Sequence, residues 1–438
     1  MISIKNIKYL ELKKFDWKLF LSLIALSLVP FLLQTIETFV VSINISAKAI
    51  DVIGQIEWYD LIDETIQAFL IIPLYSILNS VLKNDKGNFA NIVFKSLILV
   101  FLLYSMFSLV VLFYSKHLIS FMNPQEIDLS LINKYLLLST FAFMIDIVAD
   151  FANVVFVVIG KSVNVYIFLA FKVFSTILSD FLIIPAFGVI GVGLAKILTS
   201  TILSVVALAI LSIQKSIKIS RFGKSDLVLM KDWSRIGAFS GLQQFIANVV
   251  YALMIVRIVN EVSESGNYWL CNNFIWGFLL LPVNALCEVI RKDCKDGYKN
   301  LKQSNYYIIL FAIFVLWALS ITFWMPFFKV VEHLENYRRI FEICLMMIPF
   351  FIPYALQQVP DNIFIGLGKT KYNFINTALV NFIYYGVWFA LYKTKAINFD
   401  MNMIILMFGF GMVVSCAISF IQEKVFFIKR TLKSHPTL

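Results

Sequence analysis

Long apolar runs separated by short polar connections dominate this sequence. Of its 438 residues, 60% are hydrophobic and only 15% are charged, whereas about a quarter of an average soluble domain is charged. Each run has about 20 residues or more, the length that an α-helix needs to cross a bilayer. The first run, from near Trp17 past Phe39, is too long for the core of a signal peptide, so we interpret it as a retained spanning helix. The sequence therefore predicts an all-α integral membrane protein.

The apolar runs predict twelve transmembrane helices, joined by short connections except near 214–233 and 292–303. The predicted spans are 17–44, 55–82, 90–114, 131–159, 164–186, 189–213, 234–260, 267–291, 304–327, 340–367, 372–393 and 400–427.

Short patterns repeat at matching places along the chain. Asp16-Trp17 opens the first span and Asp232-Trp233 the seventh, while Gly160-Lys161-Ser162 after span four matches Gly368-Lys369-Thr370 after span ten. The repeat predicts two six-helix lobes related by a pseudo-two-fold axis along the membrane normal, an arrangement common in transporters. The predicted parts are a basic cytoplasmic lead-in, an N-terminal lobe, a cytoplasmic linker, a C-terminal lobe and a cytoplasmic tail, at 1–16, 17–213, 214–233, 234–428 and 429–438.

Basic residues concentrate in alternate loops, which predicts the orientation. The lead-in, the 214–233 loop and the tail are rich in Lys and Arg and fall on one side of the membrane. The positive-inside rule places that side and both termini in the cytoplasm, for a multi-pass protein of the plasma or inner membrane. Orientation thus accounts for the net charge of +10, and we expect no nucleic-acid partner.

Residues that carry enzymatic or metal-binding chemistry show no pattern. The five cysteines lack CxxC spacing and four lie in or beside apolar runs, so neither a disulfide framework nor a zinc site is predicted. No nucleophile, phosphate loop or metal set is present, and we expect no enzyme activity and no cofactor beyond a coupling ion. The cysteines and histidines are Cys271, Cys287, Cys294, Cys344, Cys416, His117, His333 and His435.

Three motifs follow one another along the chain. They are Leu118-Ile-Ser-Phe-Met-Asn123 followed by Tyr135, then Ser179-Asp180-Phe-Leu-Ile-Ile-Pro-Ala-Phe-Gly188 leading into Gly191, Gly193 and Ala195, and last Ile365-Gly-Leu-Gly-Lys-Thr-Lys371. With these motifs the chain resembles the MATE family of multidrug and toxic-compound extrusion transporters, in the superfamily that includes polysaccharide-lipid flippases. The resemblance covers nearly the whole length and implies two six-helix lobes that form a V.

The chain departs from the family pattern at its acidic residues. Val41 stands where the family usually carries an Asp in span one, and Glu37, one turn earlier, is a candidate substitute. The acids that one branch carries in spans seven and ten are also missing, with Asn248 and Gln357 near those positions. Of the family acids only Asp180 in span five is clearly retained, which leaves the coupling scheme open.

Four carboxylates are predicted to lie at one depth of the N-terminal lobe. A helix rises about 1.5 Å per residue, which puts Asp180 and Glu37 in the outer half of the membrane. Asp60 and Glu64 of span two lie there too and share one helix face. Carboxylates crowded in a partly dry cavity repel one another, so at least one should hold a proton or bind a cation. We therefore predict that Asp180, Glu37, Asp60 and Glu64 couple transport to protons or Na⁺.

A structural alternative remains for part of this set. Glu57 and Asp60 would then belong to a wet outer end of span two, without a role in coupling. Asp63 points about 100° away from the shared face, so we do not include it.

A second polar layer is predicted in the inner half of the same lobe. Asp146 and Asp150 are spaced i, i+4 on span four with Asn153 on the same side, and Lys172 of span five is the fourth member. Pairing of Lys172 with these acids is a structural alternative. Lys172 and Lys196 could equally extend their side chains to the membrane surface.

The predicted C-terminal lobe carries polar residues that are mostly uncharged. They could contact cargo through hydrogen bonds, or they could join helices to one another. These residues are Gln243, Gln244, Asn248, Gln357, Gln358 and Asp361.

The sequence leads to one main hypothesis and two alternatives. We expect a monomeric secondary active antiporter in the lipid bilayer that exports amphipathic small molecules by alternating access, driven by inward proton or Na⁺ flow. One alternative is a flippase for a lipid-linked sugar, which a basic central cavity would favour because the cargo carries phosphate. The other is a degenerate, non-transporting receptor or scaffold, which the missing family acids suggest.

Overall fold

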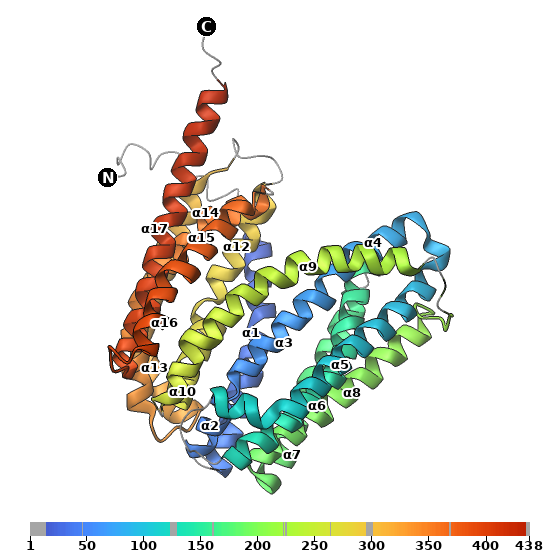
Figure 1. Ribbon diagram of the computed structural model, residues 1–438, viewed down its shortest axis with the longest axis horizontal. Helices are drawn as coiled ribbons and strands as arrows, with labels where there is room; N and C mark the ends of the chain where they lie inside the picture. Colours follow the sequence, from blue (N-terminus) through green and yellow to red (C-terminus); the bar gives the residue numbers. More distant parts are fainter. Residues whose placement is uncertain are drawn as a thin grey trace. The chain divides into compact units, whose positions relative to one another are not determined.

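The computed structural model is helical, and the residues that it describes contain no β-strand (Figure 1). It describes residues 15–45, 47–122, 129–159, 162–221, 223, 226–262, 264–294, 301–367 and 369–434. The prediction of an all-α fold is confirmed.

Most of the predicted spans coincide with long apolar helices. Among the described residues, ten helical segments are long and apolar enough to cross a membrane, or eleven if the bent pair Ser265–Leu279 and Leu281–Asp293 forms one span. The remaining predicted span, 234–260, falls on a helix in which Arg235, Gln244 and Asn248 lower the hydropathy. That helix is therefore more polar than its neighbours. Its amide side chains bond to residues of the helix at Glu57–Leu70, as described below.

The helices form two compact units. We call Thr35–Gly266 the central unit and the described residues on either side of that range the flanking unit. The central unit holds the second part of α1 (Trp17–Asn44), α2 (Ala47–Gly54), α3 (Glu57–Leu70), α4 (Ile72–Asn84), a short turn at Lys86–Asn88, α5 (Phe89–Met122), α6 (Leu129–Ile159), α7 (Ser162–Phe187), α8 (Val189–Ile213), α9 (Asp226–Tyr251), a π-helical turn at Ala252–Val256 and α10 (Arg257–Glu261).

The flanking unit contains the first part of α1 and the remaining helices. These are α11 (Ser265–Phe274), α12 (Leu281–Asp293), α13 (Gln303–Pro326), α14 (Tyr337–Gly366), α15 (Lys371–Leu379), α16 (Gly386–Lys393) and α17 (Met401–Ser434), with π-helical turns at Ile275–Leu279, Phe327–Val331 and Val380–Tyr385. The predicted lobes, 17–213 and 234–428, remain a prediction, although packing assigns α9 to the central unit.

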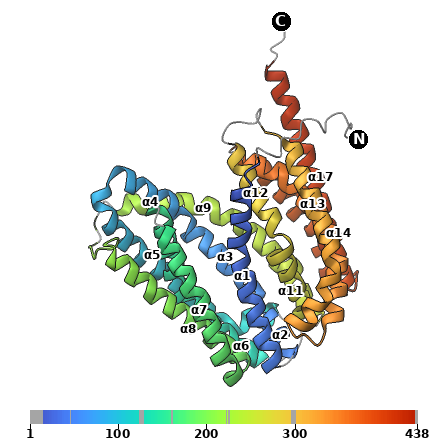
Figure 2. The same ribbon diagram turned by 180° about the vertical axis from the view of Figure 1, so that it is seen from behind.

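Helices α6, α7 and α8 run side by side within the central unit (Figures 1 and 2). Gly188 joins α7 to α8 with φ of 61°, in the left-handed region that glycine adopts without steric cost. The two helices therefore form an antiparallel hairpin. Asp180 and Lys196 each lie eight residues from Gly188, so the hairpin brings both to about the same level, about 12 Å from the turn.

Helix α9 packs along α3 and α4 (Figure 1). Helix α9 comes close to the backbone of α3 at Gly237, where a Cβ atom would lie 2.5 Å from the carbonyl oxygen of Phe69. Only a residue without a side chain fits at this distance, and small residues commonly allow such close helix contacts in membranes. The second half of the sequence thus supplies a helix to the central unit.

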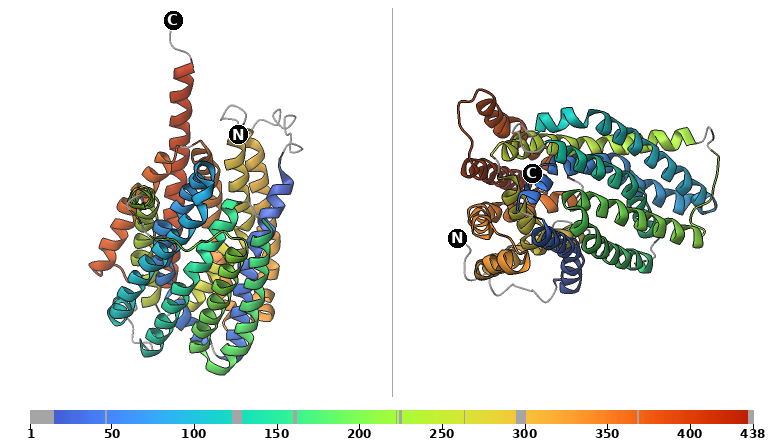
Figure 3. Two further views of the ribbon diagram at one scale, coloured as in Figure 1. Left: turned by 90° about the vertical axis from the view of Figure 1, so that its right-hand side faces the viewer. Right: turned by 90° about the horizontal axis from the view of Figure 1, so that it is seen from below.

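In the flanking unit, α14 packs against α12, α13 and α17. An aromatic cluster lies at one end of α13, where the ring centroid of Phe274 is 5.5 Å from that of Trp324 and 5.0 Å from that of Phe328. Helix α17, at the red end of the colour scale, continues beyond the other helices of its unit (Figure 3).

The cysteines depart from the sequence-based expectation. Cys271 of α11 and Cys344 of α14 form a disulfide, with Cα atoms 5.5 Å apart, so the prediction of no disulfide is wrong for this pair. A separation of 73 residues leaves no local pattern from which to recognise it. Cys287, Cys294 and Cys416 are free and buried.

We predict that Gly237→Ala destabilises the protein by about 1–3 kcal/mol, because the new methyl group collides with the backbone of α3. Thermal unfolding of the purified protein in detergent measures the effect. Gly386→Ala is the matched control, because a Cβ atom there meets nothing within 4 Å and alanine favours a helix. Equal melting temperatures for the two variants would contradict the close contact.

We predict that Glu332, between α13 and α14, makes stability fall as pH rises from about 5 to about 8. Burial raises the pKa of this carboxyl to about 8, so the folded state holds a proton that the unfolded state has released. Glu332→Gln should flatten this part of the stability curve. Unfolding of the wild type and the variant across pH checks the prediction, and parallel curves would refute it.

Candidate functional site

Carboxylates from three helices gather in the central unit. We call Glu37 of α1, Glu57 and Asp60 of α3, and Asp180 of α7 the acid cluster. The charges of Glu37 and Asp60 act on Glu57, and the charge of Glu37 also acts on Asp180. Three of the four residues predicted for coupling, Glu37, Asp60 and Asp180, are therefore brought together, although their role in coupling stays a prediction.

Local helix geometry explains the cluster. Glu57 and Asp60 are spaced i, i+3 in the first turn of α3, so their side chains lie on the same face. Both side chains are half-buried, whereas the structural alternative, a wet outer end of span two, predicts that they are exposed to water. The negative charges also stand at the amino end of α3, where the helix dipole favours them.

Asp180 is the most deeply buried member of the acid cluster. Its side chain is 4% exposed, and its Oδ2 atom makes no hydrogen bond with any described residue. A buried polar atom without a partner costs free energy, which a proton or a bound cation would recover. This oxygen can therefore accept a proton, whereas no group of three or more His, Cys, Asp or Glu side chains among the described residues is placed to hold a metal ion.

Lys196 of α8 supplies a positive charge to the same place. Its Nζ atom donates a hydrogen bond to the hydroxyl of Tyr135, at 3.1 Å, and its charge acts on Glu57, Asp60 and Asp180. The sequence left open whether Lys196 extends to the membrane surface. Its ammonium group instead bonds to Tyr135 of α6, and its charge acts on acids of α3 and α7.

Glu64, the fourth predicted coupling residue, lies at one edge of the acid cluster. It is exposed, and its charge acts on Glu57 and Asp60. Its Oε2 atom accepts hydrogen bonds from Asn248 at 3.3 Å and Gln244 at 3.4 Å. Two residues predicted to contact cargo in the C-terminal lobe therefore bind an acid of α3.

Asn248 also bonds directly to the α3 helix. Its Nδ2 atom lies 2.7 Å from the carbonyl oxygen of Leu61 and 3.2 Å from the hydroxyl of Thr65. These contacts fit the helix-joining alternative. They also explain why α9 carries amide side chains where the other spans are apolar.

Asp63, which we left out of the predicted set, forms a separate buried site. Its carboxylate accepts a hydrogen bond from the hydroxyl of Tyr104 on α5 and another from Gln67 at 2.8 Å. The predicted direction of Asp63, away from the acid cluster face, agrees with these partners. Its charge interacts with that of Asp60 and with those of Asp150 and Asp146.

The second polar layer stays a prediction, although three of its members act on one another through their charges. Asp146 and Asp150 interact with each other and with Lys172 through their charges. Lys172 is exposed, and no ion pair within 4 Å joins it to either acid among the described residues. The Oδ1 atom of Asn153 is buried and makes no hydrogen bond with the described residues.

The remaining predicted cargo contacts lie in the flanking unit. Asp361 accepts hydrogen bonds from Ser419 of α17 at 2.6 Å and from Gln357 at 2.8 Å, and Gln358 bonds to Asn362 at 3.2 Å. The Ser419 bond joins α14 to α17, as the helix-packing alternative requires, and the other two bonds lie within α14. The side chain of Gln243 lies outside the described part of the chain.

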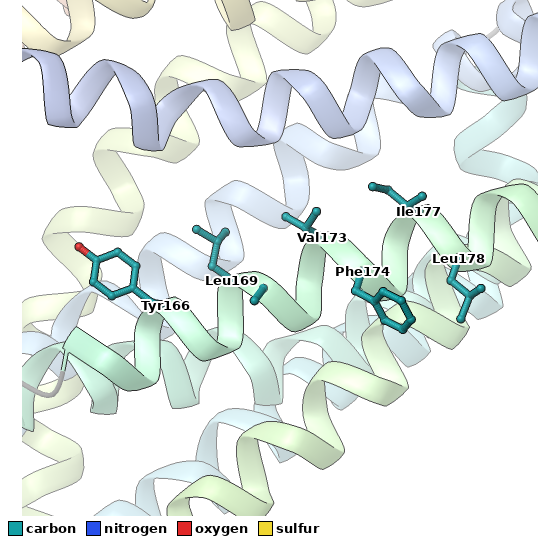
Figure 4. Close-up of a pocket in the computed structure, with 7 residues that line it drawn as sticks. Tyr166, Leu169, Val173, Phe174, Ile177 and Leu178 are labelled. Atoms are coloured by element: carbon teal, nitrogen blue, oxygen red, sulfur yellow. The ribbon is translucent and has the colours of Figure 1, made fainter.

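A separate apolar hollow of about 550 Å³ borders α7. Figure 4 shows that the lining side chains, from Tyr166 to Leu178, all come from this one helix. None of them is ionisable near neutral pH, so we do not include the hollow in the candidate site. It suits contact with lipid chains.

Comparison with known proteins supports the fold through structure alone. No model of a known protein family and no curated protein matches the sequence. Among solved structures, an inward-facing multidrug resistance MATE family transporter of the MOP superfamily has a TM-score of 0.74 at 16% identity, covering 91% of this chain and 95% of that one. An outward-facing structure with the same description has a TM-score of 0.63 at 15% identity, covering 93% and 94%.

A third structure broadens the comparison. It is described as a MOP superfamily transporter from Pyrococcus furiosus in which reversed polarity of the binding pocket suggests a different function, with a TM-score of 0.66 at 15% identity over 94% and 96% of the two chains. The chain therefore has the fold of the MATE transporters. This confirms the resemblance to MATE transporters and the all-α fold class that the sequence predicted.

We predict that Tyr104→Phe destabilises the protein by about 1–3 kcal/mol, because Asp63 loses a hydrogen bond in a buried position. Thermal unfolding in detergent checks this. Tyr114→Phe, at an exposed position of the same helix, is the control and should have little effect. If both variants unfold alike, Tyr104 does not satisfy the Asp63 carboxylate.

Proposed function

We propose that the protein is a secondary active antiporter that exports amphipathic organic molecules and draws energy from inward proton or Na⁺ flow. The observation that carries the proposal is the buried, unpartnered carboxylate oxygen of Asp180 beside the charges of Glu37 and Lys196. The MATE fold supports a transporter, and the acid cluster supplies the ion chemistry that a coupled transporter needs. We place the protein in the plasma or inner membrane with both termini in the cytoplasm.

Charge repulsion gives the cluster a way to drive a conformational change. Without a bound ion, four carboxylates face a single ammonium group, and their repulsion favours any arrangement that separates them or admits water. Binding of an ion removes part of that repulsion and favours a closer arrangement. A ligand shifts a conformational equilibrium only as far as its affinities for the two states differ, and this cluster offers such a difference.

Coupling then follows from the order of events. An ion that binds on one side stabilises one state of the transporter, and its release on the other side returns the protein to the alternative state. Cargo that binds the ion-free state better moves in the opposite direction. The identity of the cargo would be set by surfaces that the acid cluster does not include.

The flippase alternative has less support. A phosphate-bearing cargo needs free positive charge. Lys196 lies among several carboxylates, and the charge of Lys172 is shared with Asp146 and Asp150. Neither lysine therefore offers an uncompensated cation.

Transport by reconstituted proteoliposomes tests the proposal. A panel of amphipathic compounds is loaded, and the proton and Na⁺ gradients are imposed separately. Gradient-dependent efflux of any compound supports an antiporter. Complete absence of substrate and ion flux across the panel would favour the receptor or scaffold alternative.

We predict that Asp180→Asn lowers gradient-driven efflux by about 5–150-fold, the range that a typical coupling free energy produces. The amide keeps the size of the side chain but cannot release a proton or hold a cation. Glu342→Gln, at an exposed acid of α14 that contacts Arg339, is the control and should transport normally. Full gradient-dependent efflux by Asp180→Asn would remove Asp180 from the coupling site.

A further inference from the structure

The start of α9 is part of the hydrophobic core of the central unit. Trp233 is 4% exposed and lies in the same buried cluster as Leu74 of α4 and Phe89 at the start of α5. Ser220, in the connection that leads to α9, donates a hydrogen bond to the carbonyl oxygen of Asn91 of α5, at 3.4 Å. The helix that the sequence repeat assigns to the C-terminal lobe therefore begins within the packing of α4 and α5.

The middle of α9 is bound to α3. At Gly237 the two backbones are so close that a Cβ atom would lie 2.5 Å from the carbonyl oxygen of Phe69. Farther along, Asn248 donates hydrogen bonds to the carbonyl oxygen of Leu61 at 2.7 Å and to the hydroxyl of Thr65 at 3.2 Å. Close approach at small residues and hydrogen bonds between helices are the interactions that hold membrane helices together.

The far end of the same predicted span is also bonded to the N-terminal helices. Asn260 of α10 donates hydrogen bonds to the carbonyl oxygens of Gln55 at 3.3 Å and Met122 at 3.4 Å. The backbone N–H of Gly266 donates to the Oδ1 atom of Asp51 on α2, at 2.8 Å. All of these partners belong to the first half of the sequence.

These contacts cover the whole thickness of a bilayer. Gly237 and Asn260 lie about 35 Å apart along a helix that rises about 1.5 Å per residue, and the hydrocarbon core of a bilayer is about 30 Å thick. In alternating access, the two halves of a transporter separate on one side of the membrane at a time. A helix of the opposite lobe would therefore leave the N-terminal helices at one end. Helices α9 and α10 are bound to them at both ends.

We propose that α9 and α10 move with the N-terminal helices during transport, so that the boundary of the moving body lies at Gly266 and not at the 214–233 linker. This inference rests on the proposed function for the motion itself. The seventh predicted span is then a fixed wall of the central unit, and α11 is the first helix beyond the boundary. Glu64 keeps its amide partners on α9 in both states of the transporter.

A disulfide between α3 and α9 tests the proposal. A Cβ atom at Gly241 would overlap the ring of Phe69, at the ring carbon that is bonded to the Phe69 Cβ atom. In the double variant Phe69→Cys/Gly241→Cys the ring is absent, which leaves the two Cβ atoms near the spacing of about 3.5–4.5 Å that a disulfide requires. Gradient-driven efflux from proteoliposomes is measured with the disulfide oxidised and again after its reduction, and peptide mapping verifies the cross-link.

If α9 moves with α3, the oxidised and reduced protein should transport equally. Loss of efflux on oxidation, restored by reduction, would overturn the proposal. The single variants Phe69→Cys and Gly241→Cys are the matched controls, because they carry the same substitutions and cannot form the cross-link.

Spin-label distances test the proposal without a transport assay. Leu242 of α9, Val205 of α8 and Leu316 of α13 are exposed, so labels attached at Cys substitutions there disturb little packing. The pair Leu242→Cys/Val205→Cys should keep one distance at acidic and neutral pH, with and without Na⁺ and cargo compounds. The pair Leu242→Cys/Leu316→Cys should change its distance when the protein changes state.

A change of the α9–α8 distance between conditions would overturn the proposal. So would an α9–α8 distance distribution broader than that of the control pair Phe113→Cys/Val205→Cys, which joins α5 and α8. If the cross-linking variant does not fold, the labelled pairs still decide. If no compound is transported and no pair changes its distance, the proposed function fails, while the width of the α9–α8 distribution still shows whether α9 is a rigid part of the central unit.

Discussion

Carboxylates outnumber basic groups at the acid cluster of the central unit, and the surrounding structure must accommodate this excess of negative charge. The charges of Glu37, Glu57, Asp60 and Asp180 interact with one ammonium group, and Asp63 interacts with a second set of acids. Inside a bilayer such a collection is expensive unless its members share protons, pair with cations or serve a function. The hydrogen bonds of Tyr104, Tyr135 and Asn248 are arranged around these charges, and the apolar remainder of the unit surrounds them.

Backbone geometry determines which charges meet. The left-handed Gly188 turns the chain sharply between α7 and α8, and this turn sets Asp180 opposite Lys196. Gly237 allows α9 to approach α3 closely enough for Asn248 to reach Glu64. The two glycines contribute no chemistry of their own. They fix the distances on which the chemistry of the acids depends.

Much of the fold and part of the site could be predicted from the sequence. Apolar runs specify helices almost by themselves, because the bilayer leaves the backbone few alternatives. Helical periodicity also placed Glu57 and Asp60 on one face and turned Asp63 away from it. The partners across helices could not be predicted, because periodicity within one helix says nothing about which helix lies opposite. Tyr104, Tyr135 and Lys196 were missed as partners for this reason, and the disulfide between Cys271 and Cys344 was missed because its members are far apart in sequence.

Because α9 packs on α3, the boundary of the compact unit differs from the boundary that the sequence repeat predicts. A chain with two similar halves suggests duplication of an ancestral six-helix protein, and the natural cut would fall in the linker at 214–233. The compact unit nevertheless runs on to Gly266, so a fragment ending at that linker would lack one of its own walls. Glu64 would then lose the amides that hold it. The second half of the sequence therefore bears on the chemistry of the first, because α9 supplies the hydrogen-bond partners of Glu64.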